Sequence, residues 1–252
     1  MSIKISIITA TYNSEKTISA TIDSVLSQNY KNVEYIIIDG ASSDRTMDIV
    51  RSYGSLISKV ISEPDRGIYD AMNKGIKIAT GDVIGILNSD DLYNNEQVLN
   101  EIVGVFERDD VEAVYGDLVY VDENDIGKVI RTWRSGIFKP GSFALGWHPP
   151  HPALFIKREI YEKYGAFDLN FEISADFELM LRLFEKYMIK PAYIPKILVR
   201  MRLGGASNKS LKNIIKGNIN CYRAFIKNNI KVSVLYPLFR LLPKIRQFFH
   251  LV

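Results

Sequence analysis

The amino-acid sequence predicts an α/β protein whose central sheet is mainly parallel, with helices on both faces. Over the first 95 residues, short β-branched apolar runs alternate with segments of helical periodicity. The 252 residues, 47% of them hydrophobic, are enough for one large domain with a sizeable core. With 24% charged residues and no low-complexity run, the chain is neither disordered nor collagen-like.

Four buried strands are expected in this first part, each followed by a polar cluster. The strands cover residues 4–9, 33–38, 56–61 and 83–87. The polar clusters cover residues 9–13, 39–44, 63–66 and 88–91. Because ligands of parallel α/β sheets bind outside the carboxyl ends of the strands, these clusters indicate a site.

Three helices connect these strands. The first buries a single stripe, formed by Ile18, Ile22, Val25 and Leu26. The second follows Asp44 as an N-cap and turns inward Met47, Ile49 and Val50. The third carries Ile68, Met72, Ile76 and Ala79 on one face and is expected to end with Gly81 as its C-cap.

After residue 95 the alternation loosens. We expect a helix over 98–106, a strand pair near 113–121 and 128–133, a proline-rich loop over 136–152, a strand over 153–156 and a short helix from Lys157. A helix should begin near Asp176, with a late strand over 193–199. From Lys209 onward the pattern is helical, basic and aromatic, interrupted by two prolines.

The charges are distributed unevenly along the chain. All 29 acidic residues lie at or before Glu185, whereas 14 of the 32 Lys and Arg follow it. A basic, aromatic tail after an acidic body indicates an anionic partner such as phosphates, lipid headgroups or nucleic acid. The alternative is a solvated helical face.

The cysteine count and the apolar runs bear on location. Cys221 is the only cysteine, which excludes a disulfide framework, a cysteine-based metal cage and a C-x-x-C redox pair. No run reaches the ~18 apolar residues of a membrane span. Residues 1–13 alternate like a strand and lack the features of a signal peptide, so we expect a cytoplasmic protein.

Several polar residues suit particular chemistry, each with a structural alternative. Asp90 and Asp91 suit a hard divalent cation, or else Asp91 caps the next helix while Asp90 faces water. Asp39 can bond a base or ribose, or support the turn at Gly40. Asp176 can act as a general base or as an N-cap.

Other polar side chains could contact phosphate. His148 and His151, three residues apart in a loop, could serve a metal or a phosphate, or neither. Candidates for diphosphate contacts are Arg66, Lys74, Arg200 and Arg202, or else each is a surface charge. Neither G-x-G-x-x-G nor G-x-x-x-x-G-K-[ST] occurs, which disfavours dinucleotide and P-loop NTPase functions.

Three segments together resemble glycosyltransferase family 2, the inverting nucleotide-sugar transferases of the GT-A fold. They are residues 6–13 (SIITATYN), 36–44 (IIIDGASSD) and 63–75 (EPDRGIYDAMNKG), the last continuing to 79–82 (ATGD). The resemblance covers about residues 3–205. Within this family, the segment 63–75 resembles bacterial enzymes that build colanic-acid, O-antigen and capsule-type glycans. It implies a GT-A domain over 1–207, with a Rossmann-like nucleotide-sugar half (1–95) and an acceptor half (96–207). Residues 208–252 would form a basic amphipathic helical extension.

The resemblance also implies roles for residues. The nucleotide-binding set would be Thr9, Thr11, Tyr12, Asn13, Asp39, Arg66, Asn73 and Ser89. Asp90 would be the main ligand of Mg²⁺ or Mn²⁺ with Asp91 auxiliary, because Asn88 stands where the family's D-x-D motif has its first Asp. Asp176 would be the general base, beside Ala175 in place of the family's Glu. Donor or acceptor contacts would come from Asn88, His148, His151 and Arg202, and residues 202–207 resemble a lid.

The implied reaction is a single displacement that inverts the anomeric carbon. Asp176 would take a proton from an acceptor hydroxyl, and metal on Asp90 would stabilise the leaving nucleoside diphosphate. The resemblance favours a UDP-sugar donor and a glycan or polyprenyl-diphosphate-linked acceptor, in lipopolysaccharide or another cell-surface polysaccharide. No Q-x-x-R-W motif of processive synthases occurs.

The tail interleaves apolar and basic residues, as interfacial helices on anionic leaflets do. We therefore expect a peripheral location on the inner face of the plasma membrane. The alternatives are packing on the body or a homodimer contact.

The sequence bears on three other functions. A nucleotide-sugar binder without catalysis would explain Asn88 and Ala175. A nucleotidyltransferase would want a basic glycine-rich loop after the first strand, which residues 11–14 do not form. A nucleic-acid partner is not expected, because no recognisable nucleic-acid module occurs.

Overall fold

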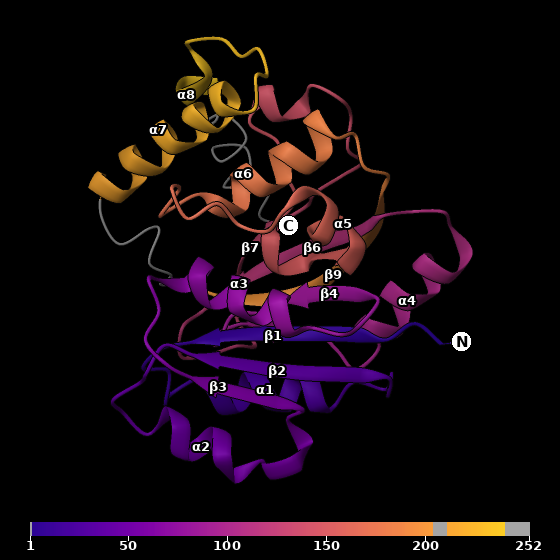
Figure 1. Cartoon of the computed structure of the whole chain (residues 1–252), viewed down its shortest axis with the longest axis vertical. Helices are drawn as coiled ribbons and strands as arrows, with labels where there is room; N and C mark the ends of the chain where they lie inside the picture. The colour runs from indigo at the N-terminus through magenta and orange to yellow at the C-terminus, as the bar shows by residue number, and fades with distance from the viewer. Residues whose placement is uncertain (1, 204–210, 240–252) are drawn as a thin grey trace.

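The computed structural model describes residues 2–203 and 211–239. In this part of the chain one mixed sheet runs in the order β3-β2-β1-β4-β8-β6-β9-β5, with β7 paired to β6 (Figure 1). The strands are β1 (Ile5–Thr11), β2 (Val33–Asp39), β3 (Lys59–Ser62), β4 (Val83–Ile86), β5 (Leu92–Tyr93), β6 (Ala113–Val121), β7 (Val129–Trp133), β8 (Leu154–Lys157) and β9 (Pro191–Arg202).

The helices cover both faces of this sheet. They are α1 (Ile18–Leu26), α2 (Thr46–Ser52), α3 (Ile68–Ile78), α4 (Val98–Arg108), α5 (Arg158–Tyr164), α6 (Ala175–Leu181), α7 (Leu211–Lys227) and α8 (Tyr236–Phe239). Short helical turns are η1 (Gly54–Leu56), η2 (Ser142–Leu145), η3 (His151–Ala153) and the π-helical η4 (Arg182–Lys186), which continues α6.

The sheet changes character along its width. Strands β3, β2, β1 and β4 are parallel, as the sequence predicts. Beyond β4 the neighbours β8 and β6 pair antiparallel, while β9 returns parallel to β6. The sheet is therefore mixed, and its parallel part brings the carboxyl ends of β1, β2 and β4 to one edge.

Two apolar layers enclose the sheet. On one face Ile8 and Ile38 belong to a buried cluster with residues of α3, α6 and α7. On the other face Ile7 and Ile37 belong to a cluster with α1, α2 and α4. Because both faces are covered, every residue of β1 is buried, including the polar Ser6, Thr9 and Thr11.

Local details of the first half differ from the expectation. Asp44 lies one residue before the N-cap of α2, although its carboxylate still accepts a hydrogen bond from the Thr46 N–H at 2.9 Å. Strand β3 begins three residues later than expected, because Gly54 adopts a positive φ of 55° and starts η1. Leu56 is consequently 61% exposed.

The end of α3 also differs. Its C-cap is Ala79 in an extended conformation, so the prediction that Gly81 caps this helix is wrong. A Cβ at Gly81 would lie 2.6 Å from the backbone nitrogen of Ser6, so glycine is needed there for close approach of two backbones. Ile68 is exposed at the first turn of α3, whereas Met72 and Ile76 are buried as expected.

The tail is joined to the body through one face of α7. Cys221, Ala224 and Phe225 are fully buried in the cluster that also contains Phe177 of α6. This face matches the alternative in which the tail packs on the body. The expected boundary between residues 207 and 208 lies outside the described residues. None of the described helices is both long and apolar enough to cross a membrane.

Glu34 at the start of β2 provides a test of the fold. Its carboxylate, 5% exposed, accepts hydrogen bonds from Ser6 and Thr80 and pairs with Lys59 at 2.8 Å. Burial opposes ionisation, but these partners outweigh it and lower the pKa of Glu34 from 4.5 to about 2. A lowered pKa stabilises the folded state above pH 4.5, and this stabilisation is lost as the pH falls toward 2.

We expect Glu34→Gln to lower the free energy of unfolding at pH 7 by about 3 kcal/mol, the equivalent of this pKa shift. The difference from wild type should shrink in urea denaturation curves between pH 4.5 and 2. Glu159→Gln, at a side chain 69% exposed, is the matched control and should change little. A Glu34→Gln deficit that is the same at every pH would contradict the proposed linkage.

Candidate functional site

The polar clusters after β1, β2 and β4 come together at one edge of the sheet, as predicted. Thr11 at the end of β1 lies opposite Asp39 at the end of β2. Beyond the strand ends, the Ser14 and Ser89 hydroxyls lie 2.8 Å apart and join the β1 and β4 clusters. Asn13 Oδ1 accepts a hydrogen bond from the Ser43 N–H at 2.9 Å, joining the β1 and β2 clusters.

Asp39 is fully buried and shapes the turn after β2. Its carboxylate accepts hydrogen bonds from the Ser42 hydroxyl and N–H and, at 2.6 Å, from the Ser62 hydroxyl. The turn-supporting alternative therefore has direct support, and contact with a nucleobase stays a prediction.

An open surface adjoins this turn. Tyr12 is 63% exposed, and its ring lies beside Gly40, where an added Cβ would be 3.4 Å from the ring and 2.5 Å from Asp65 Oδ2. A flat exposed ring, a glycine and a carboxylate together can accept a planar base and its ribose. Asp65 was not among the predicted site residues, although it lies within the 63–75 motif.

The acidic cluster after β4 contains buried oxygens without partners. Asp91 Oδ2 accepts a hydrogen bond from the Asn88 amide at 2.9 Å, but Asp91 Oδ1 and Asn88 Oδ1 are buried and make none. Burial raises the pKa of Asp91 well above its usual range, the negative charge of Asp90 raises it further, and Asn88 and Arg202 oppose the shift. Such oxygens are costly to bury unless something binds them.

These residues fit a divalent cation. Mg²⁺ and Mn²⁺ favour oxygen ligands and keep positions for water and substrate phosphate. Asn88, Asp90 and Asp91 offer amide and carboxylate oxygens, two of them orphaned. Across the described residues, no three His, Cys, Asp or Glu side chains converge as a metal site, so a cation here would need the Asn88 amide, water or substrate oxygens beside the two carboxylates.

Arg202, at the end of β9, lies close to this cluster. Its positive charge and a hydrogen bond from its backbone act on Asp91. The guanidinium donates to the Glu123 carbonyl at 3.0 Å, while its Nε is buried without a partner. A guanidinium beside a cation site suits a diphosphate. Residues 204–207 of the expected lid lie outside the described part of the chain.

Asp176 is in the first turn of α6. The N-cap of this helix is Ser174, so the alternative in which Asp176 is the N-cap is wrong. The carboxylate accepts a hydrogen bond from the Tyr69 hydroxyl at 2.9 Å. Nearby, burial lowers the pKa of His151 below its usual value, an effect that the charge of Asp176 opposes.

Tyr120 of β6 links the two acidic parts of the site. Burial raises the pKa of Tyr120, and Arg131 opposes this increase. The charges of both Asp91 and Asp176 also raise the pKa. The acidic cluster and Asp176 therefore both lie within electrostatic reach of one side chain. This arrangement brings the acidic cluster and the Asp176 carboxylate into the same part of the molecule.

Aromatic rings extend from Tyr120 toward α6. The Trp133 ring is stacked on Tyr120, and His148 contacts Trp133 edge-on with ring centroids 5.1 Å apart. His148 also contacts Phe177, the neighbour of Asp176, at 5.5 Å. Rings of this kind can pack against the apolar faces of a sugar.

Two predicted nucleotide contacts have other partners in the structure. Arg66 is largely exposed and pairs with Asp70 at 3.4 Å. Asn73 donates to the Phe167 carbonyl and accepts from the Phe167 N–H, both at 2.9 Å. Both polar ends of the Asn73 amide are thus engaged with the Phe167 backbone, and a contact of Asn73 with the nucleotide stays a prediction.

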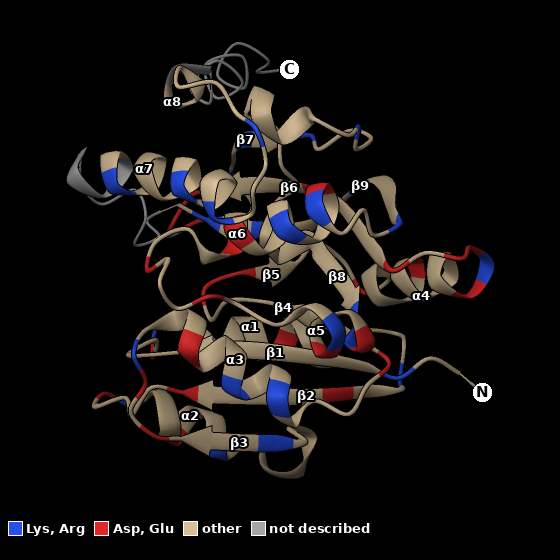
Figure 2. Cartoon of the chain, turned by 45° about the horizontal axis from the view of Figure 1, so that its top comes forward, with Lys and Arg blue, Asp and Glu red and all other residues tan. Residues whose placement is uncertain are grey.

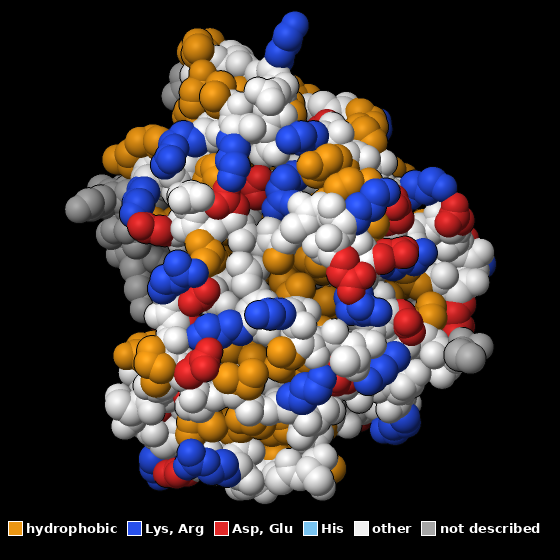
Figure 3. Space-filling model, viewed as in Figure 1, with side chains coloured by type: hydrophobic (Ala, Val, Ile, Leu, Met, Phe, Trp, Pro, Cys, Tyr) orange, Lys and Arg blue, Asp and Glu red, His pale blue; other side chains and the backbone are white. Residues whose placement is uncertain are grey.

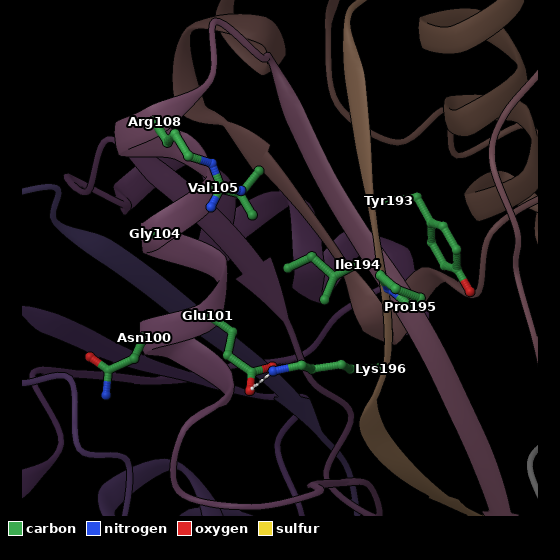
Figure 4. Close-up of a pocket in the computed structure, with 9 residues that line it drawn as sticks. All are labelled: Asn100, Glu101, Gly104, Val105, Arg108, Tyr193, Ile194, Pro195 and Lys196. Carbon is green, nitrogen blue, oxygen red and sulfur yellow. Dashed lines mark hydrogen bonds and ion pairs between the residues drawn. The ribbon is translucent and has the colours of Figure 1, made fainter.

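A separate hollow of about 400 Å³ lies between α4 and β9 (Figure 4). It is lined by residues such as Tyr193 and Arg108, and Glu101 and Lys196 form an ion pair of 2.8 Å within it. None of the predicted site residues contributes to this hollow, so it is not the candidate site.

Comparisons with known proteins agree on one family. Residues 6–165, more than half of the chain, match the family model described as Glycosyl transferase family 2. A PGL/p-HBAD biosynthesis glycosyltransferase of Mycobacterium bovis is 27% identical over 208 residues, covering 81% of this chain and 78% of the relative. An uncharacterized glycosyltransferase of Mycobacterium tuberculosis is 31% identical over 194 residues, covering 71% and 68%.

Solved structures resemble the whole chain. S. aureus TarS in complex with UDP-GlcNAc matches with a TM-score of 0.67 and 15% identity, over 99% of this chain and 73% of that one. The mannosyltransferase PcManGT from Pyrobaculum calidifontis, in complex with GDP-Man and Mn²⁺, matches with a TM-score of 0.63 and 20% identity, over 100% and 71%. At these identities the likeness shows a shared fold.

Proposed function

Because the chain belongs to glycosyl transferase family 2 and has the predicted GT-A fold, we propose that it transfers a sugar from a UDP-sugar to a hydroxyl of a glycan or polyprenyl-diphosphate-linked acceptor. The observation that carries this proposal is the pairing of two features near Tyr120. One is the acidic cluster with its orphaned oxygens, and the other is Asp176. A metal-dependent displacement needs ligands for the cation and a base for the acceptor hydroxyl. In this proposal the acidic cluster provides the ligands and Asp176 is the base.

The residues divide the work of an inverting transfer. Asp176 removes the proton from the acceptor hydroxyl, whose oxygen attacks the anomeric carbon from the side opposite the leaving diphosphate. Arg202 is placed to contact that diphosphate. A divalent cation held by Asn88, Asp90 and Asp91 would supply charge stabilisation for the leaving group. Tyr12 and Asp65 border the position proposed for the nucleobase and ribose.

The relatives support the donor and the setting. TarS binds UDP and UDP-GlcNAc, and PcManGT binds GDP-Man with Mn²⁺, according to their structures. A PGL/p-HBAD biosynthesis glycosyltransferase is among the sequence relatives. We therefore propose a role in assembling a cell-surface polysaccharide or glycolipid.

Nucleotide binding tests the proposal. Calorimetry should show UDP binding that requires Mn²⁺ and is abolished by EDTA. Asp90→Ala should weaken this binding on the order of 10- to 100-fold, because the carboxylate that holds the cation is lost. Asp48→Ala on the exposed surface of α2 is the control.

Each other outcome is informative. UDP binding of equal strength in EDTA would contradict the metal role. A preference for GDP would mean that the donor is a GDP-sugar, and the proposed transfer reaction would be unchanged. A folded sample that binds no nucleotide would contradict the proposed function.

We also propose that the outer face of α7 docks on an anionic membrane surface. Ile215, Ile219 and Ile226 form an exposed stripe on this helix, opposite its buried face. Lys and Arg lie along the same helix (Figure 2), and apolar and basic side chains lie side by side over α7 (Figure 3). Such a surface suits anionic headgroups.

The structure also limits this proposal. Lys216 pairs with Glu172 and Lys227 with Asp168, so part of the basic charge of the tail is neutralised by the body. The proposal of membrane docking therefore rests more on the exposed isoleucines of α7 than on the basic charge of the tail.

Liposome flotation measures this docking. The triple variant Ile215→Ser/Ile219→Ser/Ile226→Ser should lower partitioning onto anionic vesicles at least about tenfold, because three apolar side chains no longer enter the interface. Leu56→Ser/Val60→Ser, on exposed apolar residues of η1 and β3, is the control. Unchanged flotation of the triple variant would exclude this surface, and dissociation of a dimer by the same variant would identify a homodimer contact instead.

A further inference from the structure

Helix α3 reaches the acceptor half through two side chains one turn apart. The Tyr69 hydroxyl donates to Asp176 Oδ1 at 2.9 Å. Asn73 forms its paired hydrogen bonds with the backbone of Phe167. The two contacts lie at positions i and i+4, on the same face of the helix.

These contacts reinforce each other. The Tyr69 ring packs against the Phe167 ring, with centroids 5.3 Å apart. Phe167 is therefore hydrogen-bonded to Asn73 through its backbone and supports Tyr69 through its ring. Tyr69 therefore has its ring fixed at one end and its hydroxyl fixed at the other. A hydroxyl held in this way can set both the position and the orientation of the carboxylate that it contacts.

The hydroxyl remains a donor over the working pH range. Burial and the neighbouring charge of Asp176 raise the pKa of Tyr69 well above 10. Tyr69 therefore does not compete with Asp176 for the role of base. A hydrogen bond donated to a carboxylate stabilises its ionised form, which is the form that can accept a proton from the acceptor.

We propose that Tyr69 is a positioning residue for the transfer reaction: its hydroxyl holds Asp176 Oδ1 and leaves Oδ2 to accept the proton of the acceptor hydroxyl. This inference rests on the proposed function, in which Asp176 is the base. It explains why a tyrosine within the 63–75 motif, in the nucleotide-sugar half, contacts a carboxylate 107 residues later.

Other titratable groups face the same place. His151 of η3 and Tyr120 of β6 interact electrostatically with Asp176, and Cys221 of α7 interacts with Tyr69. None of these groups is changed by substituting Tyr69. A difference between wild type and Tyr69→Phe therefore reports the lost hydroxyl.

The test is the pH dependence of UDP release from UDP-GlcNAc, with water as the acceptor, by the full-length protein. Tyr69→Phe should lower kcat about tenfold, leave KM for UDP-GlcNAc within about twofold, and move the acidic limb of the kcat profile upward by about half to one pH unit. Tyr187→Phe, in a partly exposed tyrosine, is the control and should match wild type.

The outcomes separate the inference from the function on which it rests. Loss of turnover in Asp176→Asn together with an unmoved acidic limb in Tyr69→Phe would overturn the role of Tyr69 alone. Full turnover in Asp176→Asn would overturn the assignment of the base, whereas no UDP release by wild type would overturn UDP-GlcNAc as the donor and leave the resonance measurement below as the test of Tyr69.

A measurement without substrate gives a second readout. In ¹³C-aspartate-labelled protein at pH 5, the carboxyl resonance that is missing in Asp176→Asn should move toward the protonated position in Tyr69→Phe. An unchanged resonance would contradict the inference, because the hydrogen bond from Tyr69 would then have no effect on the carboxylate.

Discussion

Replacing Asp176 with asparagine is expected to lower kcat about 10²- to 10⁴-fold while the protein folds and binds its donor normally. This is the usual contribution of a positioned general base. Asparagine has the shape of aspartate, and its Oδ1 can still accept the hydrogen bond from Tyr69. It cannot take the proton of the acceptor hydroxyl, so only the chemical step is lost.

Steady-state kinetics and calorimetry on the same samples check this prediction. Asp48→Asn, at an exposed aspartate of α2, is the control and should keep its turnover. Near wild-type kcat in Asp176→Asn would show that the base has been misassigned. A changed affinity for UDP would instead show that Asp176 supports the nucleotide site.

The prediction also separates two functions that share this fold. A nucleotide-sugar binder without catalysis would show no turnover in wild type, so Asp176→Asn would change nothing. Asn88 and Ala175 favour that alternative from sequence alone. The hydrogen bond between Asp176 and Tyr69 is compatible with both functions, because a partly buried carboxylate needs a donor in either, so the turnover of the wild-type protein decides between them.

The first half of the fold could be predicted because its signals are local. All residues of β1 are buried, so the strand consists of β-branched and small residues, and α1 carries its inward stripe at helical spacing. The predicted C-cap of α3 was wrong because a tertiary contact, and not the end of the helix, explains the glycine there. Gly81 follows α3 as a C-cap glycine would, but the backbone of Ser6 requires glycine there.

The second half depends on long-range pairing. Strand β8 lies between β4 and β6 and is antiparallel to both, an order that no local pattern encodes. Strand β5 was not predicted because it has only two residues, and it pairs with β9 more than 100 residues away. The π-helical turn after α6 has no distinctive sequence signal either.

The candidate site was predictable where it lies at strand ends. Asp39 and Asp91 each follow a buried strand, and the parallel sheet brings those ends together. The partners of these residues were not predictable. Arg202 beside Asp91 and Tyr69 beside Asp176 join segments that are distant in the chain and share no periodicity.

The tail shows the same limit. Its alternating composition predicted an amphipathic helix, and α7 is one. Composition could not say which face meets the body, because Phe225 and Ile226 are equally apolar neighbours. Phe225 is fully buried, whereas Ile226 is exposed.

Replacing Glu178 with alanine is expected to lower the free energy of unfolding by about 3–5 kcal/mol. Glu178 of α6 is fully buried, and its Oε1 lies 3.0 Å from Nε of Arg182, whose side chain is 12% exposed. Arg182 also donates to the carbonyls of Gly165 and Ala166, at 3.1 and 2.7 Å. Without Glu178, its guanidinium would keep its buried position and lose its counter-charge.

Urea denaturation with linear extrapolation measures the loss. The exposed pair Arg158–Glu162 has the same i,i+4 spacing, so Glu162→Ala is the matched control and should cost less than about 1 kcal/mol. Adding Arg182→Met to Glu178→Ala should recover only part of the stability, because it removes the unpaired charge but also the donor to the Gly165 and Ala166 carbonyls. A Glu178→Ala loss no larger than that of the control would contradict the argument.

The same pair should affect catalysis through its neighbours. Asn228, just after α7, donates to Glu178 Oε1 at 3.0 Å, so the pair also holds the tail against α6. Arg182 donates to the carbonyls of Gly165 and Ala166, which immediately precede Phe167. The Phe167 backbone is in turn hydrogen-bonded to Asn73 of α3. Glu178→Ala should therefore lower kcat of the folded protein with little change in UDP affinity, because the pair fixes the helix that carries Asp176 and not the nucleotide site.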